Sequence, residues 1–498
     1  MDTVQVQTLT QYISALRQEI SFFLPEMCII AGIILLLLAS LIRRLNSPAL
    51  LRAIALGSLL LSGISVWSSH RVTEDLFGDV LIIEPLGSYF GALVLLGTAV
   101  TLLSLPLFKD EARELPEQIF ALMTMALGMV LLIKSRHLLM LIVSLELISI
   151  SAYLLTAFRK EGAFSGEASM KYLIFGAFSS ALMIYGISWL YGLSGSLTLT
   201  DSSLQHAWQN APATAQLIIG GLISAGILFK IGLVPFHFWA PDVYQAVSFP
   251  LAAHFSVSPK AAGLVALLVL NAYLPFSGPL IWWYAGVAVA SMTLGNLAAL
   301  GQQNIKRLLA FSSIAQAGYI VLGILAGTSL GYAAVAFYVT IYLLMNYGAF
   351  FLTGWLLRNK PTNQLREFHG LAKQAPLAAM LLTLCFLALT GLPPTAGFIA
   401  KWYVLLSVFE GMIAGNEKLA YLLLTATVLN TVVSLFYYLK VPALMVFQTP
   451  QETEQAPQNR GFILMVSILC AGLLVFGVWG FGTLIETLET WAGASLAP

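Results

Sequence analysis

Charged residues are scarce in this sequence. Asp, Glu, Lys and Arg make up 9% of its 498 residues, whereas soluble domains carry roughly 25%. A chain with so few charges cannot keep a folded surface in water, which excludes an ordinary soluble protein. The formal net charge is only +1, and no basic stripe with interleaved aromatic residues occurs, so no nucleic-acid partner is predicted.

Cysteine is also scarce, and sequence motifs for cofactors are missing. Cys28, Cys385 and Cys470 lie inside apolar runs without a CxxC or a His/Cys ligand spacing, so we interpret them as small core residues. The sequence contains no phosphate loop, dinucleotide fingerprint, haem or iron–sulfur ligand set, and no convincing Ser-His-Asp order. We therefore predict no cofactor and no metal in this chain, and any transport would be driven by another subunit or by an ion gradient.

Apolar residues make up 59% of the sequence and are concentrated in long runs. Each run is long enough to cross a hydrocarbon core of roughly 30 Å as a helix. We predict an all-α membrane protein with about fourteen transmembrane helices, the first of which is not a signal peptide because no small-residue cleavage site precedes Arg43 and Arg44. The predicted spans are 22–42, 51–69, 88–108, 118–134, 137–157, 168–193, 216–239, 247–274, 279–300, 309–326, 331–357, 377–409, 419–442 and 461–482.

Lys and Arg are distributed unevenly over the predicted loops. Cytoplasmic loops are enriched in these residues, so we predict that both termini lie on the outer side of the membrane. Lys134 and Arg136 are a local exception. The richer set is Arg43, Arg44, Arg52, Lys109, Arg113, Arg159, Lys160, Lys306, Arg307, Arg358, Lys360, Arg366, Lys373, Lys440 and Arg460, and the poorer set is Arg17, Arg71, Lys134, Arg136 and Lys418.

The chain repeats itself weakly at an offset of about 160 residues. Leu182-Met-Ile-Tyr-Gly186 recurs as Leu344-Met-Asn-Tyr-Gly348, and Gly232-Leu-Val-Pro235 recurs as Gly391-Leu-Pro-Pro394. An odd number of helices separates equivalent elements, which predicts two inverted five-helix repeats. The predicted parts are residues 1–117 with three helices, the repeats at 118–275 and 279–442, and a C-terminal helix in 443–498.

Gly and Pro inside the seventh and twelfth spans predict that these two helices are broken. Proline removes a helical hydrogen bond, and lipid cannot satisfy the backbone groups that a break exposes. Such breaks therefore face protein or water. A simple kink is the alternative for a single proline, but two matched breaks beside buried lysines favour an ion path.

Four charged residues fall near the middle of predicted spans. They are Glu146, Lys230, Lys260 and Lys401. A central charge costs roughly 2.5–3.5 kcal/mol on insertion scales, so such residues usually face the bundle interior and mark an ion path. Three lysines face one glutamate, and we expect at least one lysine to be neutral or hydrated, which suits proton relay. The alternatives are snorkelling to the headgroups and a static Glu–Lys pair that only fixes packing.

Three further residues are possible members of the path. Lys171 lies near the start of its span and is either an interfacial anchor or part of the path. His237 and His254 have side chains that titrate near neutrality, and the alternative for each is a structural imidazole. Pro259 precedes Lys260 and would free a carbonyl near Phe255, which could hold water beside that lysine.

Several of these segments together resemble the subunit N family of the bacterial proton-pumping NADH:quinone oxidoreductase, respiratory complex I, which is one of its antiporter-like subunits. The similarity extends over most of the chain, and the run Lys230–Gln245 is the most specific. The residues that carry it are Ser144–Ser149, Lys171-Tyr172, Phe229–Gln245, Pro259-Lys260, Asn304–Leu309 and Gly391–Lys401. The proline before Lys260 departs from the commonest pattern of the family and puts the local helix geometry in doubt.

The resemblance implies roles for the buried charges. Glu146 and Lys230 would form a charge pair that responds to a conformational or electrostatic signal, Lys260 would be the central relay, and Lys401 would exchange protons with the outer side. It also implies that NADH, FMN, iron–sulfur clusters and quinone belong to partner subunits. Expected partners are the lipid bilayer, the neighbouring antiporter-like subunit M and the small subunits K, J and A, in a bacterial inner membrane with periplasmic termini.

Other members of the same fold remain alternatives. Sister subunit M would be expected to carry Glu where this chain has Lys401, and sister subunit L would need a long C-terminal extension. A multisubunit cation/proton antiporter, a hydrogenase-type complex and a purely structural membrane scaffold are the other interpretations.

Overall fold

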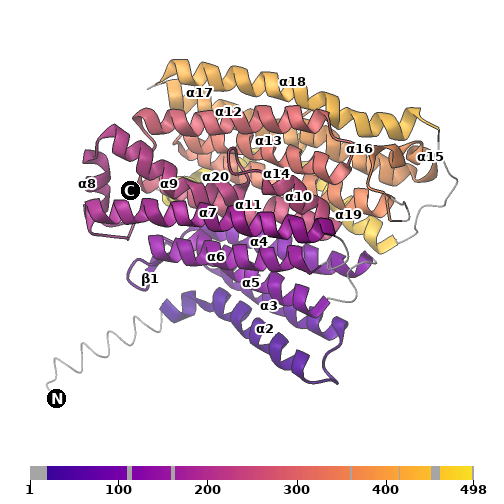
Figure 1. Ribbon diagram of the computed structural model, residues 1–498, viewed down its shortest axis with the longest axis horizontal. Helices are drawn as coiled ribbons and strands as arrows, with labels where there is room; N and C mark the ends of the chain where they lie inside the picture. Colours follow the sequence, from indigo (N-terminus) through magenta and orange to yellow (C-terminus); the bar gives the residue numbers. More distant parts are fainter. Residues whose placement is uncertain are drawn as a thin grey trace.

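The computed structural model describes residues 19–108, 115–158, 163–358, 360, 362–413, 416–449, 460–479 and 481–495. It is a bundle of long helices that run side by side (Figure 1). The helices are α2 (Leu24–Leu41), α3 (Pro48–Ser68), α4 (Pro85–Ser104), α5 (Leu115–Lys134), α6 (Leu138–Ala157), α7 (Ala163–Ser194), α8 (Ser202–Asn210), α9 (Ala213–Ile231), α10 (Trp239–Ala246), α11 (Phe249–Tyr273), α12 (Gly278–Leu300), α13 (Ile305–Leu325), α14 (Ser329–Leu356), α15 (Leu371–Gln374), α16 (Pro376–Thr390), α17 (Ala396–Ile413), α18 (Glu417–Phe447), α19 (Arg460–Val478) and α20 (Phe481–Ser495).

Thirteen of the described helices are long and apolar enough to cross a membrane. The remaining predicted span, 377–409, consists of the 15-residue α16 and the 18-residue α17. Each of the fourteen predicted spans therefore corresponds to one helix or to one broken helix. The prediction of an all-α, multi-pass membrane protein is confirmed.

Short elements outside these spans were not predicted. The strands β1 (Glu74–Leu76) and β2 (Leu81–Ile83) pair antiparallel, α8 follows α7, and α20 packs against α4 and α14. Such elements bury only a few apolar residues each, Leu204 and Trp208 in α8, so no long apolar run reveals them. The predicted C-terminal part thus holds α20 as well as α19, and α18 continues five residues past the predicted boundary at 442.

Helix starts follow local sequence signals. Proline stands in the first turn of α3, α4, α11, α12 and α16, where its missing N–H has no intrahelical partner to lose. The Ser47, Ser248 and Asn304 side chains accept hydrogen bonds from backbone N–H groups at the starts of α3, α11 and α13. These caps satisfy donors that lipid would leave unpaired.

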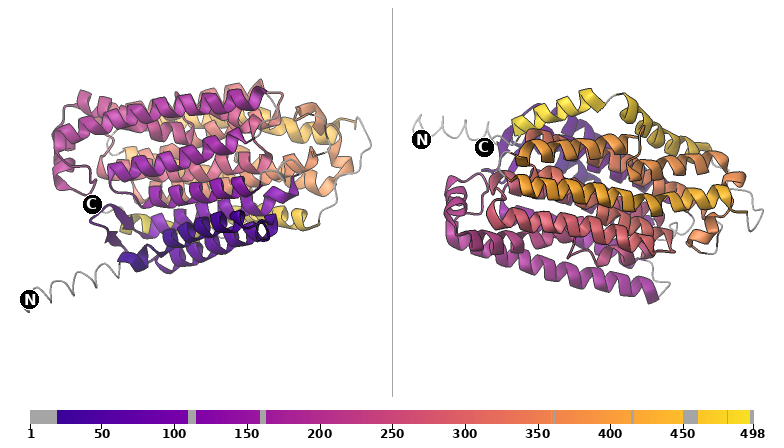
Figure 2. Two further views of the ribbon diagram at one scale, coloured as in Figure 1. Left: turned by 60° about the horizontal axis from the view of Figure 1, so that its bottom comes forward. Right: turned by 90° about the horizontal axis from the view of Figure 1, so that it is seen from above.

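The packing of the helices repeats between the two halves of the chain. The pairs α5–α6, α7–α9, α9–α11 and α5–α11 have counterparts in α12–α13, α14–α16, α16–α18 and α12–α18. The two halves meet where α11 packs against α13 and α14. The most apolar window of α11 is fully buried, so this helix lies inside the bundle. Figure 2 shows the side-by-side helices from two further directions.

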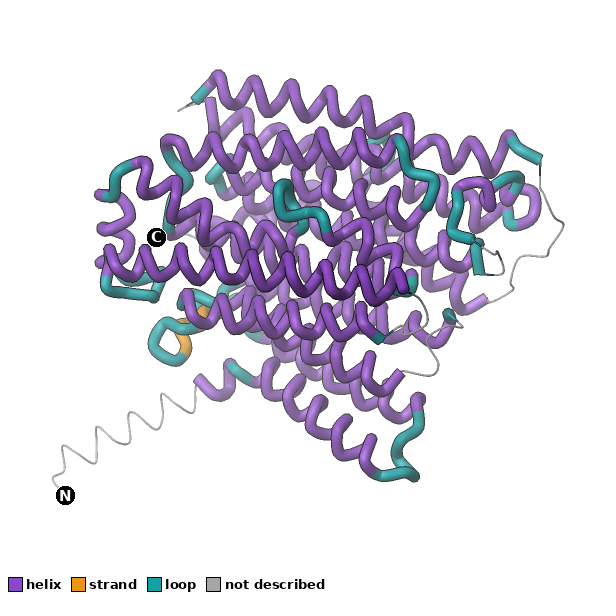
Figure 3. The backbone as a smooth tube through the Cα atoms, viewed as in Figure 1, coloured by secondary structure: helices purple, strands orange, loops and turns teal. Residues whose placement is uncertain are grey.

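Both predicted helix breaks are present and end in the same way. Gly232 and Gly391 follow α9 and α16 with φ of 78° and 83°, the left-handed conformation that glycine adopts without steric cost. The N–H groups of Gly232 and Leu233 bond the Leu228 carbonyl, and those of Gly391 and Leu392 bond the Leu387 carbonyl. The Val234–Pro235 and Pro393–Pro394 peptide bonds are cis. Figure 3 shows the loop between α9 and α10 within the length of the bundle, away from its ends.

Lys134 and Arg136, the exceptions in the charge pattern, are buried in ion pairs. Lys134 Nζ lies 2.7 Å from Glu26 Oε1, and an Arg136 nitrogen lies 2.5 Å from Glu84 Oε1. These pairs stand at the end of the bundle that carries α8 and the β1–β2 hairpin, the predicted outer end. The first and last described residues lie at this end too (Figure 1). Arg17, Lys109, Arg113, Arg159 and Lys160 lie outside the described residues.

Candidate functional site

Lys230 lies in the last turn of α9, directly before the first helix break. Its side chain is 1% exposed, and its Nζ has no hydrogen-bond partner among the described residues. Nζ lies 5.9 Å from the centre of the Tyr172 ring. Glu146 of α6 interacts electrostatically with this group, but the two make no ion pair within 4.0 Å, and Glu146 Oε1 is also without a hydrogen-bond partner. A small movement of either helix would therefore change their interaction.

Lys260 lies in the middle of α11 and is 2% exposed. Its Nζ donates to the Ser313 hydroxyl at 2.9 Å and to the Ser313 carbonyl at 3.2 Å. A Cβ placed on Gly232 would lie 3.6 Å from the same Nζ, so Lys260 faces the first helix break. Helix α11 continues through Pro259 without interruption, which resolves the doubt about the local geometry.

Lys401 lies in the first turns of α17, beyond the second break, and is 7% exposed. Its Nζ donates to the Thr390 carbonyl at 2.8 Å, a group that the end of α16 leaves free. The same Nζ lies 4.5 Å from the centre of the Tyr319 ring. The contact with the aromatic face and the hydrogen bond to the carbonyl partly offset the free-energy cost of burying a charged amine.

A polar cluster on α13 lies between Lys260 and Lys401. Gln316 donates to the Leu389 carbonyl at 2.8 Å and to the Tyr438 hydroxyl at 3.1 Å, and it accepts from the Tyr338 hydroxyl at 2.5 Å. Leu389 directly precedes Thr390, the partner of Lys401. Ser312 hydrogen bonds Tyr438, while its neighbour Ser313 binds Lys260. The cluster therefore links the surroundings of the two lysines across the second repeat.

The structure buries both candidate histidines but brings neither into hydrogen-bond contact with a lysine. His254 Nδ1 lies 3.2 Å from the Tyr347 hydroxyl, and its Nε2 has no partner among the described residues. His237 is 4% exposed, and its Nδ1 likewise has no partner. Each ring thus keeps a buried nitrogen able to bond a water or a second group.

Lys171 is 42% exposed and lies in an ion-pair network at the predicted inner end. Its Nζ pairs with Glu167 Oε1 at 2.7 Å and with Asp242 Oδ2 at 3.0 Å, while Asp242 Oδ1 accepts from Arg307 at 2.6 Å. Asp242 therefore joins α10 to α7 of the first repeat and to α13 of the second. Lys171 thus contacts the second part of the broken helix through Asp242.

Some buried polar residues were missed in the sequence. Glu26 is fully buried in α2, and Lys306 is 3% exposed, with its Nζ 2.6 Å from the Val247 carbonyl. Gln316 could have been noticed, because it is an isolated amide in the apolar span 309–326. Glu26 and Lys306 lie near predicted helix ends, where a charged side chain usually reaches the membrane–water interface. Their positions in the sequence therefore did not indicate that they are buried.

Residues that could hold a metal do not gather in the part of the chain that the structure describes. No group of three or more His, Cys, Asp and Glu side chains has a suitable arrangement there. The site consists instead of isolated lysines, hydroxyls and amides on helices of both repeats.

Two inverted repeats with buried charges at their broken helices define a class of multi-pass membrane proteins, the antiporter-like subunits. A family model described as "NADH:quinone oxidoreductase/Mrp antiporter, TM" matches residues 135–434. The chain is 35% identical over 490 residues to "NADH-quinone oxidoreductase subunit N 2" of Chloroherpeton thalassium, which covers 95% of this chain and 94% of the relative. The chain belongs to this family, and the predicted resemblance to subunit N is confirmed.

Two solved structures have the same fold as this chain, in agreement with the family assignment. A chain of respiratory complex I from Thermus thermophilus with bound aureothin superposes with a TM-score of 0.78 at 30% identity, covering 92% of this chain and 98% of that one. A chain of the membrane-bound sulfane sulfur reductase, an archaeal respiratory membrane complex, gives 0.81 at 25% identity and covers 96% and 98%.

Proposed function

We propose that this chain is a proton-translocating membrane-arm subunit of an NADH:quinone oxidoreductase. One observation carries the proposal: Lys230, Lys260 and Lys401 are enclosed in the bundle and stand at or face its two helix breaks, in a chain of the subunit N family. A static scaffold would not need three buried lysines when the predicted path contains a single acidic residue, Glu146. Electron transfer from NADH to quinone would take place in partner subunits.

In this proposal Glu146 and Lys230 form the input of the path. When Glu146 approaches Lys230, its carboxylate stabilises the protonated amine, and when it withdraws, the unpaired charge in low dielectric favours release of the proton. Lys260 would take up that proton beside Ser313. Lys401 would receive it through the Gln316 cluster and exchange it with the outer side. Lys171 would hold α10 in place, and His237 and His254 would be secondary proton carriers.

The proposal also includes the membrane, the orientation of the chain in it and the neighbouring subunits. The chain would lie in a bacterial inner membrane with both termini on the periplasmic side, as the Lys/Arg distribution indicates. Its neighbours would be the antiporter-like subunit M and the small subunits K, J and A. NADH, FMN, iron–sulfur clusters and quinone would be bound by other subunits, since this chain has no sequence motif for them.

Substitution of the input pair tests the proposal. We expect Lys230→Met and Glu146→Ala to reduce NADH-driven proton pumping severalfold in vesicles, while blue-native gels show the assembled complex. Arg71→Gln, which changes an exposed charge outside the spans, is the control. Full pumping by both variants would contradict the proposal, and loss of assembly as the first effect would favour the scaffold interpretation.

A further inference from the structure

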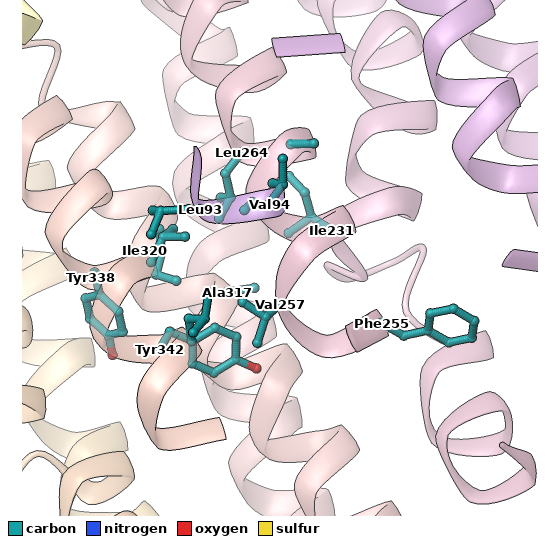
Figure 4. Packing of buried hydrophobic residues seen from close by; sticks show 14 of the residues in the cluster. Leu93, Val94, Ile231, Phe255, Val257, Leu264, Ala317, Ile320, Tyr338 and Tyr342 are labelled. Carbon is teal, nitrogen blue, oxygen red and sulfur yellow. The ribbon is translucent and has the colours of Figure 1, made fainter. Parts of the chain in front are cut away.

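Lys260 is separated from the predicted outer end of the bundle by apolar packing. Next to it, Leu264 of α11, Ala317 and Ile320 of α13 and Val339 of α14 enclose a cavity of about 10 Å³. Leu264 lies on the outer side of Lys260 along α11, and Ala317 and Ile320 lie on the outer side of Ser313 along α13, whereas Val257 lines the cavity from the inner side of Lys260. Figure 4 shows Ala317 next to Tyr342, Ile320 above them and Leu264 higher in the view.

An outward-facing pocket of about 620 Å³ lies further along the same helices. It is lined by Asn271 of α11, Leu325 of α13 and Tyr332 of α14, and also by Gly411 of α17, the helix of Lys401. Asn271 follows Lys260 by eleven residues, which is about 16 Å of helix. The pocket therefore does not reach Lys260.

The helices that separate the lysine from the pocket offer few polar groups in between. Residues 261–270 of α11 are all apolar. On the facing helices, the hydroxyl of Tyr319 bonds Asn296 and that of Tyr338 bonds Gln316, so both are already engaged. A water needs two to four polar partners and about 10–15 Å³ of room. The small cavity beside Lys260 offers the Lys260 amine and the hydroxyl of Tyr342, which has no hydrogen-bond partner among the described residues, so the cavity has room for one water at most. A hydrogen-bonded chain of waters cannot extend from there along α11 to the outer pocket, because residues 261–270 add no polar side chain.

The polar contacts of Lys260 extend along α13 toward Lys401, and do not extend toward the outer end of the bundle. Ser313 binds its Nζ, and the adjoining Ser312 and Gln316 reach Tyr438 and the Leu389 carbonyl beside the partner of Lys401. Building on the proposed function, we infer that Leu264, Ile320 and Val339 form an apolar barrier that blocks direct proton release from Lys260 to the outer side and directs protons toward Lys401.

Two kinds of substitution test the barrier in the assembled complex reconstituted in vesicles. Val339→Thr and Leu264→Asn place a polar group in the barrier, and we expect a severalfold rise in passive proton conductance, because the new group can hold water above Lys260. Val265→Thr, at a buried α11 position outside the cavity, is the matched control and should not leak. Ala317→Val fills the cavity and should leave the pumped protons per NADH unchanged.

The leak must also depend on Lys260. Adding Lys260→Met to Val339→Thr should return the conductance to that of the unmodified complex. The inference is overturned if neither polar variant leaks, if the leak survives Lys260→Met, or if Ala317→Val stops pumping, since the cavity would then be part of the working route. Full pumping by the single Lys260→Met variant would instead refute the proposed function, and the conductance measurements would still decide whether the barrier exists.

Discussion

At the scale of single residues, the buried lysines are held by backbone geometry as much as by other side chains. Lys401 donates to a carbonyl that the end of α16 leaves free, and its Cδ would lie 2.8 Å from a Cβ on Gly391. Lys260 similarly faces Gly232 at the first break. The glycine at each break thus provides the left-handed turn, and Gly391 also leaves the space that the Lys401 side chain occupies.

Gly391→Ala should therefore disturb Lys401. The methyl group forces a left-handed alanine, at a cost of about 1 kcal/mol, and also displaces the lysine stem. We expect reduced pumping with a modest loss of thermal stability of the assembled complex. Gly286→Ala is the control, because nothing lies within 4 Å of a Cβ there. Equal effects of the two variants would contradict the close fit between Gly391 and Lys401.

Replacing Gln316 should also lower the free energy of unfolding by a definable amount. Gln316→Leu leaves the Tyr338 hydroxyl and the Leu389 carbonyl without their partner, and each unsatisfied buried group costs about 1–3 kcal/mol. We expect a lower unfolding temperature of the complex and slower pumping. Thr383→Val, which removes a half-buried hydroxyl on the neighbouring α16, should have a small effect; a stable, fully pumping Gln316→Leu complex would remove the cluster from the path.

At the scale of elements, the broken helices were predictable and their anchors were not. Gly232, Pro235, Gly391 and Pro394 disclose the breaks because each has a conformational preference that the sequence carries locally. The partners that fix the second halves, such as Lys171 and Arg307 for Asp242 of α10, come from helices far away in sequence. The amphipathic α20 and the short hairpin were missed because their burial depends on the surfaces they cover.

Asp242→Asn tests the anchor of α10. The change weakens the contacts to both Lys171 and Arg307, so we expect α10 to be less stably docked and trypsin or hydrogen exchange to detect more frequent opening of this segment. Glu167→Gln removes only the exposed pair with Lys171, since Glu167 is 60% exposed, and should change little. Identical exchange rates in the two variants would mean that Asp242 does not hold α10.

At the scale of the whole molecule, two buried ion pairs join the N-terminal helices to the first repeat. Glu26 of α2 meets Lys134 at the end of α5, and Glu84 at the start of α4 meets Arg136. The arrangement of spans and repeats could be predicted from apolar runs and Gly/Pro positions. The two ion pairs could not be predicted, because a charged side chain near a helix end usually reaches water. Only the packed structure shows that these four side chains are enclosed.

Glu84→Gln should weaken this junction. Arg136 is fully buried, and breaking one partner of a buried pair costs about 3–5 kcal/mol because the other charge stays unpaired. We expect a reduced yield of assembled complex on blue-native gels. Glu84→Gln with Arg136→Gln should recover part of the loss, whereas Asp75→Asn, at an exposed position of strand β1, should assemble normally. A double variant no better than the single one would show that charge pairing is not the cause.

The central claim is that protons move through the buried lysines at the helix breaks. The most direct measurement is the number of protons pumped per NADH oxidised by the assembled complex in vesicles, compared between the unmodified chain and Lys260→Met. The account predicts a clearly lower ratio at unchanged assembly, because Lys260 faces the first break and its partner Ser313 adjoins the polar cluster that leads to Lys401. An unchanged ratio at an unchanged rate of NADH oxidation would contradict it.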